Sequence, residues 1–466
     1  MSSDVSSLFK AYDIRGLSPQ QVDETFAARL GAVLTEEFHP AHVLVGWDMR
    51  QTSPALEAAL TEAFVARGVN VTRIGQCSTP LFNVSVGLGN GAYDLGVMVT
   101  ASHNPGQYNG FKLVRGDVSP IGQGSGMEQV RERFVSSDAF MPDVSLARGT
   151  VTNDPDALAR YLDHVCALVD TANLPPIAMA IDAGNGMEGV ILPALIKRLP
   201  QITFHTLYTT PDGSFPNHEA NPLKIETLKD LSALVVKERC ALGVAFDGDA
   251  DRVGFVDEQG EPVPGDLLTA MLARPMLAAH PGARVLYDLR SSWSTRDAII
   301  EAGGEPAMCR VGHAFIKRQM RQEGALFGGE LSMHFYFKDL WNVESGDLAL
   351  LLFLQLLAVS GQPLSALWKP LKRFAKTEEI NSEVADADAA LARVEKTFAP
   401  TASSISMLDG IRMEFGVAAD GARGADAWWF SVRKSNTEPV VRLIVEAVSE
   451  KVMIEKRDAL LEMIRG

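Results

Sequence analysis

The chain has few cysteines, only Cys77, Cys166, Cys240 and Cys309 among 466 residues. None of them forms a CxxC pair and no histidine cluster lies near them, so a disulfide framework and a zinc site are excluded. Scattered cysteines in a chain of this length indicate reduced, partly buried thiols, which favours a cytoplasmic protein.

The chain also lacks an excess of positive charge. It has 43 lysines and arginines against 58 aspartates and glutamates, which gives a net charge of −15. This charge argues against a nucleic-acid-binding surface and against a polybasic membrane patch. Small anionic ligands are still compatible with it, because local geometry rather than net charge binds them.

Several sequence signals are missing. Residues 1–10 contain no basic stretch followed by an apolar run, so we expect no secretory signal. The most apolar segment, 348–359, is interrupted by Gln355 and is too short to span a bilayer, which predicts a core helix of a soluble protein. No Walker A loop is present, nor a GxGxxG fingerprint followed by the expected acidic residue, which disfavours nucleotide and dinucleotide binding.

The patterns that are present predict an α/β protein of four packed domains. Hydrophobic residues make up 46% and charged residues 22%, as in globular proteins, so disordered and fibrous classes are excluded. The length alone predicts three domains. Short β-branched runs that alternate with helical patterns indicate mostly parallel sheets, and we divide them into domains at 1–150, 151–256 and 257–369.

The last part of the chain, 370–466, has a different pattern. Strand-like runs at 405–415, 428–432 and 440–447 follow one another, with helical patterns at 386–398 and 452–464. This arrangement predicts an α+β domain with an antiparallel sheet.

Each of the three α/β domains has one polar loop directly after a strand. The strands at 95–100, 242–246 and 325–327 lead into the loops 101–105, 247–252 and 328–334. Ligands of open α/β sheets bind beyond the carboxyl ends of strands, so these loops are candidate sites.

Asp247, Asp249 and Asp251 are the strongest chemical signal, because three alternating carboxylates can converge on one hard cation. The spacing is similar to that of an EF-hand, but the sixth position is Arg252 instead of glycine and the flanks are strands. We therefore predict a Mg²⁺ site; the other interpretation is a solvated acidic turn. Arg252 beside the carboxylates suggests that an anionic group comes close to the metal.

Ser102 lies in a tight turn that Asn104-Pro105 ends. A hydrolase is not favoured, because adjacent Ser102 and His103 do not readily form a nucleophile–base contact and no GxSxG elbow is present. A serine in a polar turn is commonly structural. Beside a Mg²⁺ loop it becomes a candidate phosphate carrier, with Lys112 near enough in sequence to supply a cation or a proton.

Two further loops suit a sugar phosphate. The loop 433–439 combines a guanidinium, hydroxyls and backbone N–H groups, which can hold a phosphate dianion, although a simple hairpin turn is also consistent with it. The loop 328–334 offers a carboxylate and hydrogen-bonding side chains for sugar hydroxyls. His313 alone would usually be structural.

Taken in order, the segments 10–16, 100–105, 247–252, 329–334 and 433–439 resemble the α-D-phosphohexomutase family, most of all its bacterial phosphomannomutase/phosphoglucomutase members. The resemblance runs from end to end, with one motif in each domain. It implies a heart-shaped fold of four domains around a central cleft, and an isomerase, an intramolecular phosphotransferase that interconverts hexose 1- and 6-phosphates.

The resemblance also implies roles for individual residues. Ser102 would be phosphorylated and would bind Mg²⁺ with Asp247, Asp249 and Asp251, while Arg15, Lys112 and His334 would transfer protons and stabilise charge. The remaining residues would bind substrate: Tyr12, His103, Arg252, Arg290, Gly312, His313, Glu330, Ser332, Arg433, Ser435, Asn436 and Thr437. A hexose 1,6-bisphosphate would form as an intermediate that turns around, with glucose 1,6-bisphosphate as activator.

Two residues depart from the family pattern. Met333 stands where glycine is common, and Arg290 stands where lysine is more usual, a difference that matters at phosphate sites. Both make the preferred sugar harder to name, while Glu330 and Ser332 favour glucose or mannose phosphates over glucosamine phosphate.

Three other functions compete with this interpretation: phosphoglucosamine mutase, a Mg²⁺-dependent sugar-phosphate phosphatase, and a non-catalytic binding protein. We expect a cytoplasmic monomer whose partners are small hexose phosphates. Because the chain is acidic and its ligand is anionic, we predict a positive cleft inside a negative shell, with substrate capture weakened by salt.

Overall fold

The computed structural model describes residues 5–136, 147–434 and 440–465. They form two compact units, which we describe separately. The N-terminal unit comprises Met1–Val263, Met320–Phe327 and Ser332–Ala366, and the C-terminal unit comprises Pro264–Gln319, Gly328–Leu331 and Leu367–Gly466.

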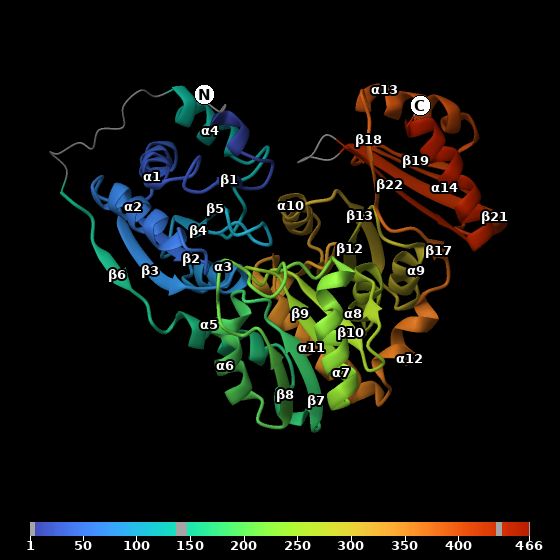
Figure 1. Cartoon of the computed structure of the whole chain (residues 1–466), viewed down its shortest axis with the longest axis horizontal. Coiled ribbons are helices and arrows are strands. Elements are labelled where there is room, and N and C mark those ends of the chain that lie inside the picture. Colours follow the sequence, from blue (N-terminus) through green and yellow to red (C-terminus); the bar gives the residue numbers. More distant parts are fainter. Residues whose placement is uncertain (1–4, 137–146, 435–439, 466) are drawn as a thin grey trace. The chain divides into compact units, whose positions relative to one another are not determined.

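The first sheet lies in the N-terminal unit and has the strand order β1-β5-β4-β2-β3-β6 (Figure 1). Its strands are β1 (Ile14–Leu17), β2 (His42–Trp47), β3 (Asn70–Gln76), β4 (Leu95–Val99), β5 (Tyr108–Arg115) and β6 (Val151–Asn153). Its helices are α1 (Glu24–Phe38), α2 (Ser53–Val65), α3 (Thr79–Leu88) and α4 (Met127–Ser136). Valines and leucines of β2 and β4 pack with Phe26, Leu30 and Phe64 of α1 and α2 to form the core.

The second sheet, also in the N-terminal unit, has the order β11-β10-β9-β7-β8. Its strands are β7 (Ile177–Asp182), β8 (Ile202–Leu207), β9 (Leu242–Phe246), β10 (Val253–Asp257) and β11 (Pro262–Val263). Its helices are α5 (Ala157–Ala167), α6 (Glu188–Arg198) and α7 (Lys229–Glu238). The prediction of mostly parallel strands holds for β7, β8 and β9, whereas β10 runs antiparallel to both of its neighbours, β9 and β11.

The apolar segment at 348–359 is a buried helix, as predicted. It lies in α11 (Gly346–Ser360), which Ser345 caps at its start and Gly361, with φ 62°, ends. No single helix in the described part of the chain is long and apolar enough to cross a membrane, although α11 and the segment Leu364–Leu371 pass that test together as a bent pair.

The strands β12 (Arg284–Asp288), β13 (Glu305–Cys309), β14 (Phe327–Gly329), β15 (Phe335–Phe337) and β16 (Val343–Glu344) form the third sheet. In the C-terminal unit β12 and β13 run parallel, and in the N-terminal unit β15 and β16 run antiparallel. The neighbouring helices in the sequence are α8 (Gly265–Ala279), α9 (Trp293–Glu301) and α10 (His313–Glu323).

The fourth sheet is antiparallel, as predicted, with the order β17-β22-β21-β20-β19 and with β18 paired to β22. Its strands are β17 (Ala375–Lys376), β18 (Ile380–Glu383), β19 (Ser404–Ser406), β20 (Ile411–Val417), β21 (Arg423–Lys434) and β22 (Val440–Ala447). Its helices are α13 (Ala387–Phe398) and α14 (Glu450–Arg465), whose Val394 and Leu460 pack in the core of this sheet. The run predicted at 405–415 is two strands, because the chain turns at Gly410, where φ is 71°.

The remaining helices are short. They are α12 (Leu364–Trp368) and the 3₁₀ helices η1 (Val5–Leu8), η2 (Thr171–Asn173), η3 (Ile225–Leu228), η4 (Lys338–Leu340), η5 (Lys369–Leu371) and η6 (Ala399–Thr401).

Candidate active site

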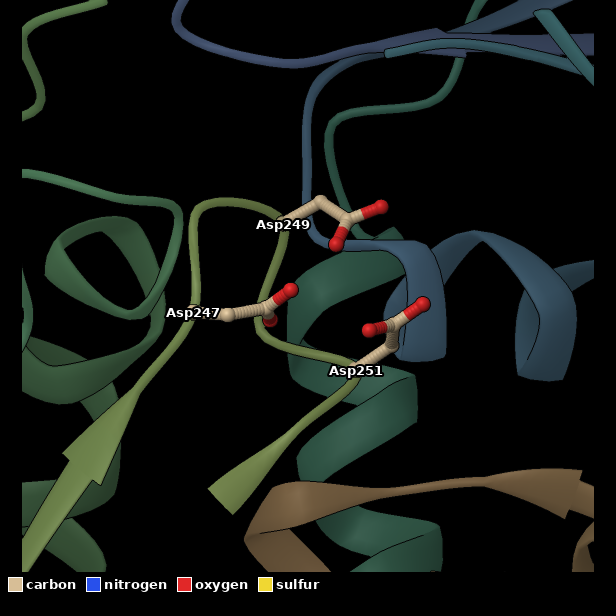
Figure 2. A group of neighbouring side chains, drawn as sticks. All are labelled: Asp247, Asp249 and Asp251. Carbon is tan, nitrogen blue, oxygen red and sulfur yellow. The ribbon is translucent and has the colours of Figure 1, made fainter. Parts of the chain in front are cut away.

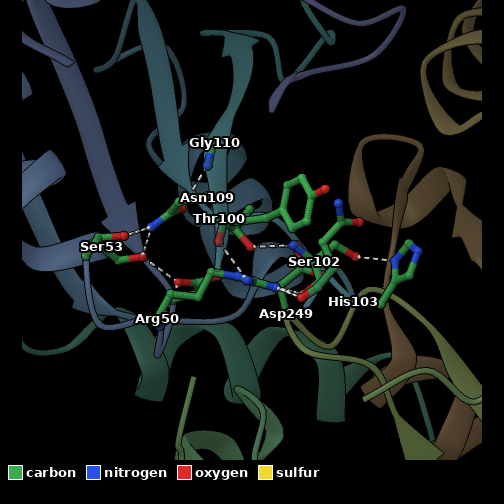
Figure 3. A network of polar contacts seen from close by, with 12 residues as sticks. Arg50, Ser53, Thr100, Ser102, His103, Asn109, Gly110 and Asp249 are labelled. Carbon is green, nitrogen blue, oxygen red and sulfur yellow. Dashed lines mark hydrogen bonds and ion pairs between the residues drawn. The ribbon is translucent and has the colours of Figure 1, made fainter. Parts of the chain in front are cut away.

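Ser102 lies in the loop that leads from β4 to the antiparallel strand β5. Its backbone is in the left-handed region, with φ 51°, and its side chain is buried. The hydroxyl Oγ donates to Asp247 Oδ2 at 2.7 Å, and the backbone N–H donates to Thr100 Oγ1 at 3.0 Å. Figure 3 shows Ser102 with Thr100 and His103 in the polar network of this loop. A serine far along the chain from Asp247 is thus held in contact with the predicted metal loop.

One expectation about this loop is wrong. Ser102 Oγ lies 3.2 Å from His103 Nδ1, although adjacent residues were not expected to make this contact. Burial, followed by the positive charges of Arg252 and Arg15, lowers the pKa of His103 well below its ordinary value, so the imidazole is neutral near pH 7.

The Asp247, Asp249 and Asp251 carboxylates come from the loop between β9 and β10 (Figure 2). All three are buried, and one ligand oxygen of each lies within 4.8 Å of the others. Asp249 Oδ1 is buried without a hydrogen-bond partner among the described residues. Burial and the neighbouring carboxylates raise the pKa of Asp247. A hard divalent cation would accept the unpaired Asp249 oxygen as a ligand and would reduce the repulsion between the three carboxylates. The residues therefore fit Mg²⁺.

Lys112, on β5, is the cation of this cluster. Its Nζ lies 2.6 Å from Asp249 Oδ2 and 2.6 Å from Asp251 Oδ2. Burial alone would lower the pKa of Lys112, but these two carboxylates raise it above its ordinary value. Lys112 therefore stays protonated and balances part of the negative charge.

A second group of side chains surrounds Asp251. His334 Nε2 lies 3.2 Å from Asp251 Oδ1 and 3.3 Å from Arg252 Nε, and His334 Nδ1 lies 3.1 Å from Ser332 Oγ. Burial alone would raise the pKa of Asp251, but Lys112, His334 and Arg252 lower it well below its ordinary value. Asp251 therefore stays ionised, whereas the pKa of Asp247 is raised.

Arg15, on β1, contacts the far side of the Ser102 loop. It donates to Asn104 Oδ1 at 2.8 Å and forms an ion pair with Asp13. Tyr12 lies in the bend before β1 and is half-buried. The N-terminal unit thus contains eleven of the predicted residues: Tyr12, Arg15, Ser102, His103, Lys112, Asp247, Asp249, Asp251, Arg252, Ser332 and His334.

The C-terminal unit holds a second set of predicted residues. Glu330 is buried and accepts a hydrogen bond from the Gly312 N–H at 2.9 Å. Gly312 has φ 124°, a conformation that side chains other than glycine rarely adopt. His313 follows as the first residue of α10. The two predicted sugar-binding segments of this unit are therefore joined by a direct hydrogen bond.

Arg290 and Arg433 belong to a cluster of arginines in the same unit. Arg433 and Arg442 each donate to the Glu379 carboxylate at 3.0 Å, and Arg290 lies 3.6 Å from it. Arg290 also donates hydrogen bonds to the Asp288 carboxylate from Nε and from Nη2, which lies 2.7 Å from Asp288 Oδ2. Burial alone would raise the pKa of Glu379, but the three guanidinium groups lower it. The predicted residues Ser435, Asn436 and Thr437 lie outside the described residues.

Sequence reasoning missed several residues of these clusters, among them Arg50 and Glu379. Arg50 follows β2 and donates to backbone carbonyls of the Ser102 loop. Its one sequence signal is the pair Asp48 and Arg50 directly after a strand. Glu379 carries no such signal, because its three partners lie far from it in the sequence.

Comparisons with known proteins show which family the chain is similar to. Four family models match in order, described as phosphoglucomutase/phosphomannomutase alpha/beta/alpha domains I, II and III and C-terminal domain, at residues 6–139, 159–260, 264–374 and 379–463.

Two curated relatives match over almost the whole chain. A phosphomannomutase of Salmonella montevideo is 39% identical and covers 96% of both chains. A protein of Xanthomonas campestris described as phosphohexose mutases is 38% identical and covers 98% of this chain and 99% of its own.

A solved structure supports the fold. It is a phosphoglucomutase/phosphomannomutase family protein from Burkholderia thailandensis, with a TM-score of 0.84 and 30% identity, and it covers 98% of this chain and 97% of its own. The predicted family, fold class and type of enzyme, a mutase that interconverts hexose 1- and 6-phosphates, are confirmed. The chain belongs to the phosphoglucomutase/phosphomannomutase family.

Proposed function

We propose that Ser102 carries the phosphoryl group in this mutase. The bond between Ser102 Oγ and phosphorus breaks as a free sugar hydroxyl bonds to phosphorus, and the proton that this hydroxyl loses is, in net terms, taken up by Ser102 Oγ. The bisphosphate then reorients, and its other phosphate returns to Ser102, while the released sugar oxygen gains, in net terms, the proton that Ser102 Oγ gives up. The observation that supports the proposal most is the 2.7 Å contact between Ser102 Oγ and Asp247, beside the carboxylate cluster.

Asp247, Asp249 and Asp251 would hold Mg²⁺ together with an oxygen of phosphorylated Ser102. When bound, Mg²⁺ supplies neutralisation of the charge on the phosphoryl oxygens. Loose transition states of phosphoryl transfer need positioning and neutralisation more than covalent help from the protein.

Lys112, Arg15 and His334 would manage charge and protons around Ser102. Lys112 stays protonated between its two carboxylates and can give a proton to the sugar oxygen when the phosphate leaves. Arg15 contributes a fixed positive charge beside the loop, since its side chain is tied to Asn104. His103, which is neutral, and Arg252 would contact the phosphoryl group from the other side.

The second set of residues would bind the parts of the substrate that do not react. In the C-terminal unit, Glu330, Gly312 and His313 would contact sugar hydroxyls. Ser332 and Tyr12 are the further substrate-binding candidates of the N-terminal unit. Arg290 and Arg433 would hold a phosphate dianion through guanidinium groups. Ser435, Asn436 and Thr437 complete this phosphate-binding loop in the proposal.

The proposed substrates are glucose and mannose phosphates, and glucose 1,6-bisphosphate is the proposed activator, because it can phosphorylate Ser102 directly. The proposed location is the cytoplasm, consistent with the four free cysteines. The proposed state is a monomer.

Intact mass spectrometry of the purified protein and of Ser102→Ala tests the carrier role. After treatment with glucose 1,6-bisphosphate, the native chain should gain one phosphate and Ser102→Ala none, with mutase activity reduced at least about 10³-fold. Ser360→Ala, at the end of α11, is the matched control and should behave like the native chain. A phosphate that is retained on Ser102→Ala would refute the proposal.

Coupled assays with glucose 1-phosphate, mannose 1-phosphate and glucosamine 1-phosphate separate the mutase substrates. Release of inorganic phosphate at the rate of turnover would instead identify a phosphatase, in which water takes the phosphoryl group from Ser102.

A further inference from the structure

Arg50 is a fully buried arginine whose side chain contacts the Ser102 loop at four points. Its Nη2 donates to the backbone oxygens of Ser102 at 2.7 Å and Asn104 at 2.5 Å. Its Nη1 donates to the backbone oxygens of Pro105 at 2.9 Å and Tyr108 at 2.8 Å. One planar guanidinium thus gathers four carbonyl groups of the segment 102–108 (Figure 3).

The guanidinium is itself held in place from two sides. Its Nε lies 3.2 Å from Asp48 Oδ2, an ion pair in which both side chains are completely buried. The ring of Phe215 covers it, with a distance of 5.5 Å from the guanidinium carbon to the ring centroid. Asp48 directly follows β2, a central strand of the first sheet. The ion pair therefore ties the Arg50 side chain to the end of that strand.

The loop needs such an anchor because its backbone is strained. Ser102 has φ 51°, and a residue with a side chain costs about 1 kcal/mol in this region. Hydrogen bonds from a charged donor are stronger than neutral ones, and four of them can offset this cost. In a trans peptide the N–H points opposite to the C=O, so the carbonyl bonds of Arg50 also direct the His103 N–H away from the guanidinium.

We propose that Arg50 is a positioning residue for phosphoryl transfer. It fixes the backbone of the segment 102–108, and thereby keeps Ser102 Oγ at Asp247, without touching the substrate. The inference rests on the proposed function, because it gives Arg50 a role only if Ser102 is the carrier. Lysine has the same charge but no planar fork, so it cannot reproduce the four contacts.

The test compares Arg50→Lys with Arg73→Lys. Arg73, on β3, is the matched control, because its guanidinium also faces a carboxylate, that of Glu57, at 2.8 Å, and lies over the ring of Trp47. For Arg50→Lys we expect kcat to fall at least tenfold, since small displacements of a reacting group cost about 10²-fold in rate. KM should change less than about threefold, because substrate-binding groups are untouched. Arg73→Lys should stay within about twofold of the native enzyme in both constants.

The rate at which glucose 1,6-bisphosphate phosphorylates Ser102, followed by intact mass, should fall in parallel with kcat. A native kcat in Arg50→Lys overturns the inference, and so does a KM that rises as much as kcat falls. If the native chain takes no phosphate on Ser102, the proposed function fails first. If the native chain is phosphorylated normally and Arg50→Lys at the same rate, the inference alone fails.

Phe215→Leu provides a second variant if Arg50→Lys does not fold. It removes the ring over the guanidinium but leaves the four hydrogen bonds, so kcat should fall about two- to fivefold with KM unchanged. A kcat equal to that of the native enzyme in a folded Phe215→Leu protein contradicts the inference in that case.

Discussion

Lys112 is the residue at which charge and chemistry are most closely linked. It is paired with two of the three carboxylates proposed to hold Mg²⁺, and its pKa is raised. The ammonium group therefore has two separate effects under the proposed function: it would supply a proton to the reaction, and it repels a second cation from the carboxylates.

Lys112→Met separates these two effects. We expect mutase activity to fall at least about 10²-fold, because the proton donor is lost. The affinity for Mg²⁺ in the absence of substrate should rise at least about fivefold, since a positive charge is removed beside the ligands. Isothermal titration calorimetry measures the affinity, with the exposed Lys372→Met as control. Weaker Mg²⁺ binding in Lys112→Met would contradict this arrangement.

Residues whose signals are local in the sequence could be predicted. The alternating aspartates lie on one loop, so their convergence followed from their spacing, and the structure groups them as expected. The contacts of Arg50 with the Ser102 loop and of Glu379 with Arg433 could not be predicted, because each joins residues more than 50 positions apart. Ser102, which contacts His103, has a left-handed backbone conformation, and the residue types in this loop did not predict that conformation.

At the scale of elements, the three polar loops and the strand that follows the loop 247–252 were predicted, but the antiparallel direction of the return strands was not. Short apolar runs before each loop give a clear pattern, whereas a return strand such as β5 cannot be assigned a direction from its sequence. Met333 shows the same limit. It has φ 66°, which explains why glycine is common at this position, and its side chain is nevertheless buried.

Three helices of the N-terminal unit meet at a buried pair of acids. Glu188 begins α6 and Asp347 lies in the first turn of α11, while Tyr161 of α5 donates to Asp347 at 2.5 Å. Burial, and then the charge of Asp347, raise the pKa of Glu188 well above its ordinary value. Burial raises the pKa of Asp347 to about 6. The folded protein thus holds protons here that the unfolded chain releases.

This pair makes stability depend on pH in a defined direction. The folded pKa values of both acids are raised. The contribution of this pair to the free energy of unfolding is therefore fully present below the ordinary pKa of a carboxyl group, and it is lost as the pH rises through the folded pKa values. Glu188→Gln removes one of the two titrations. We therefore expect its free energy of unfolding, relative to the native chain, to improve by at least about 1 kcal/mol between pH 5 and pH 8.

Urea unfolding of both proteins at these two pH values measures the difference. Glu62→Gln is the control, since Glu62 is 63% exposed and its pair with Arg148 lies at the surface. The free energies of unfolding of Glu188→Gln and of the native chain could instead differ by the same amount at both pH values. That result would show that Glu188 is ionised in the folded protein.

At the scale of the whole molecule, four sequence domains assemble into two compact units. Within the C-terminal unit, one buried residue shows how the third and the last sequence domains are joined. Glu446 of β22 accepts hydrogen bonds from the Trp293 N–H at 2.9 Å and from Trp429 Nε1 at 2.6 Å, so α9 and the fourth sheet are fastened together. Such long-range polar contacts are invisible in the sequence, which is why a division into four domains was all that patterns could predict.

The net charge of −15 now has a more specific meaning. The sequence suggested that local cations recruit an anionic substrate, but several of these cations are already neutralised within their own unit. Lys112 faces two carboxylates, Arg290 faces Asp288 and Glu379, and Arg433 shares Glu379. The attraction that remains is therefore smaller than a count of positive residues implies.

This partial neutralisation predicts a modest effect of salt on substrate capture. We expect KM for a hexose 1-phosphate to rise about two- to threefold between roughly 20 and 200 mM KCl at constant free Mg²⁺, while kcat stays constant. Screening acts over about 10 Å at 0.1 M salt, so the buried ion pairs are hardly affected and the residual field of the exposed groups is what weakens.

Sucrose at matched osmolality is the control and should leave KM unchanged. A KM that does not depend on salt would mean that no unbalanced positive charge faces the substrate, and a rise of tenfold or more would mean that the ion pairs open when the substrate binds.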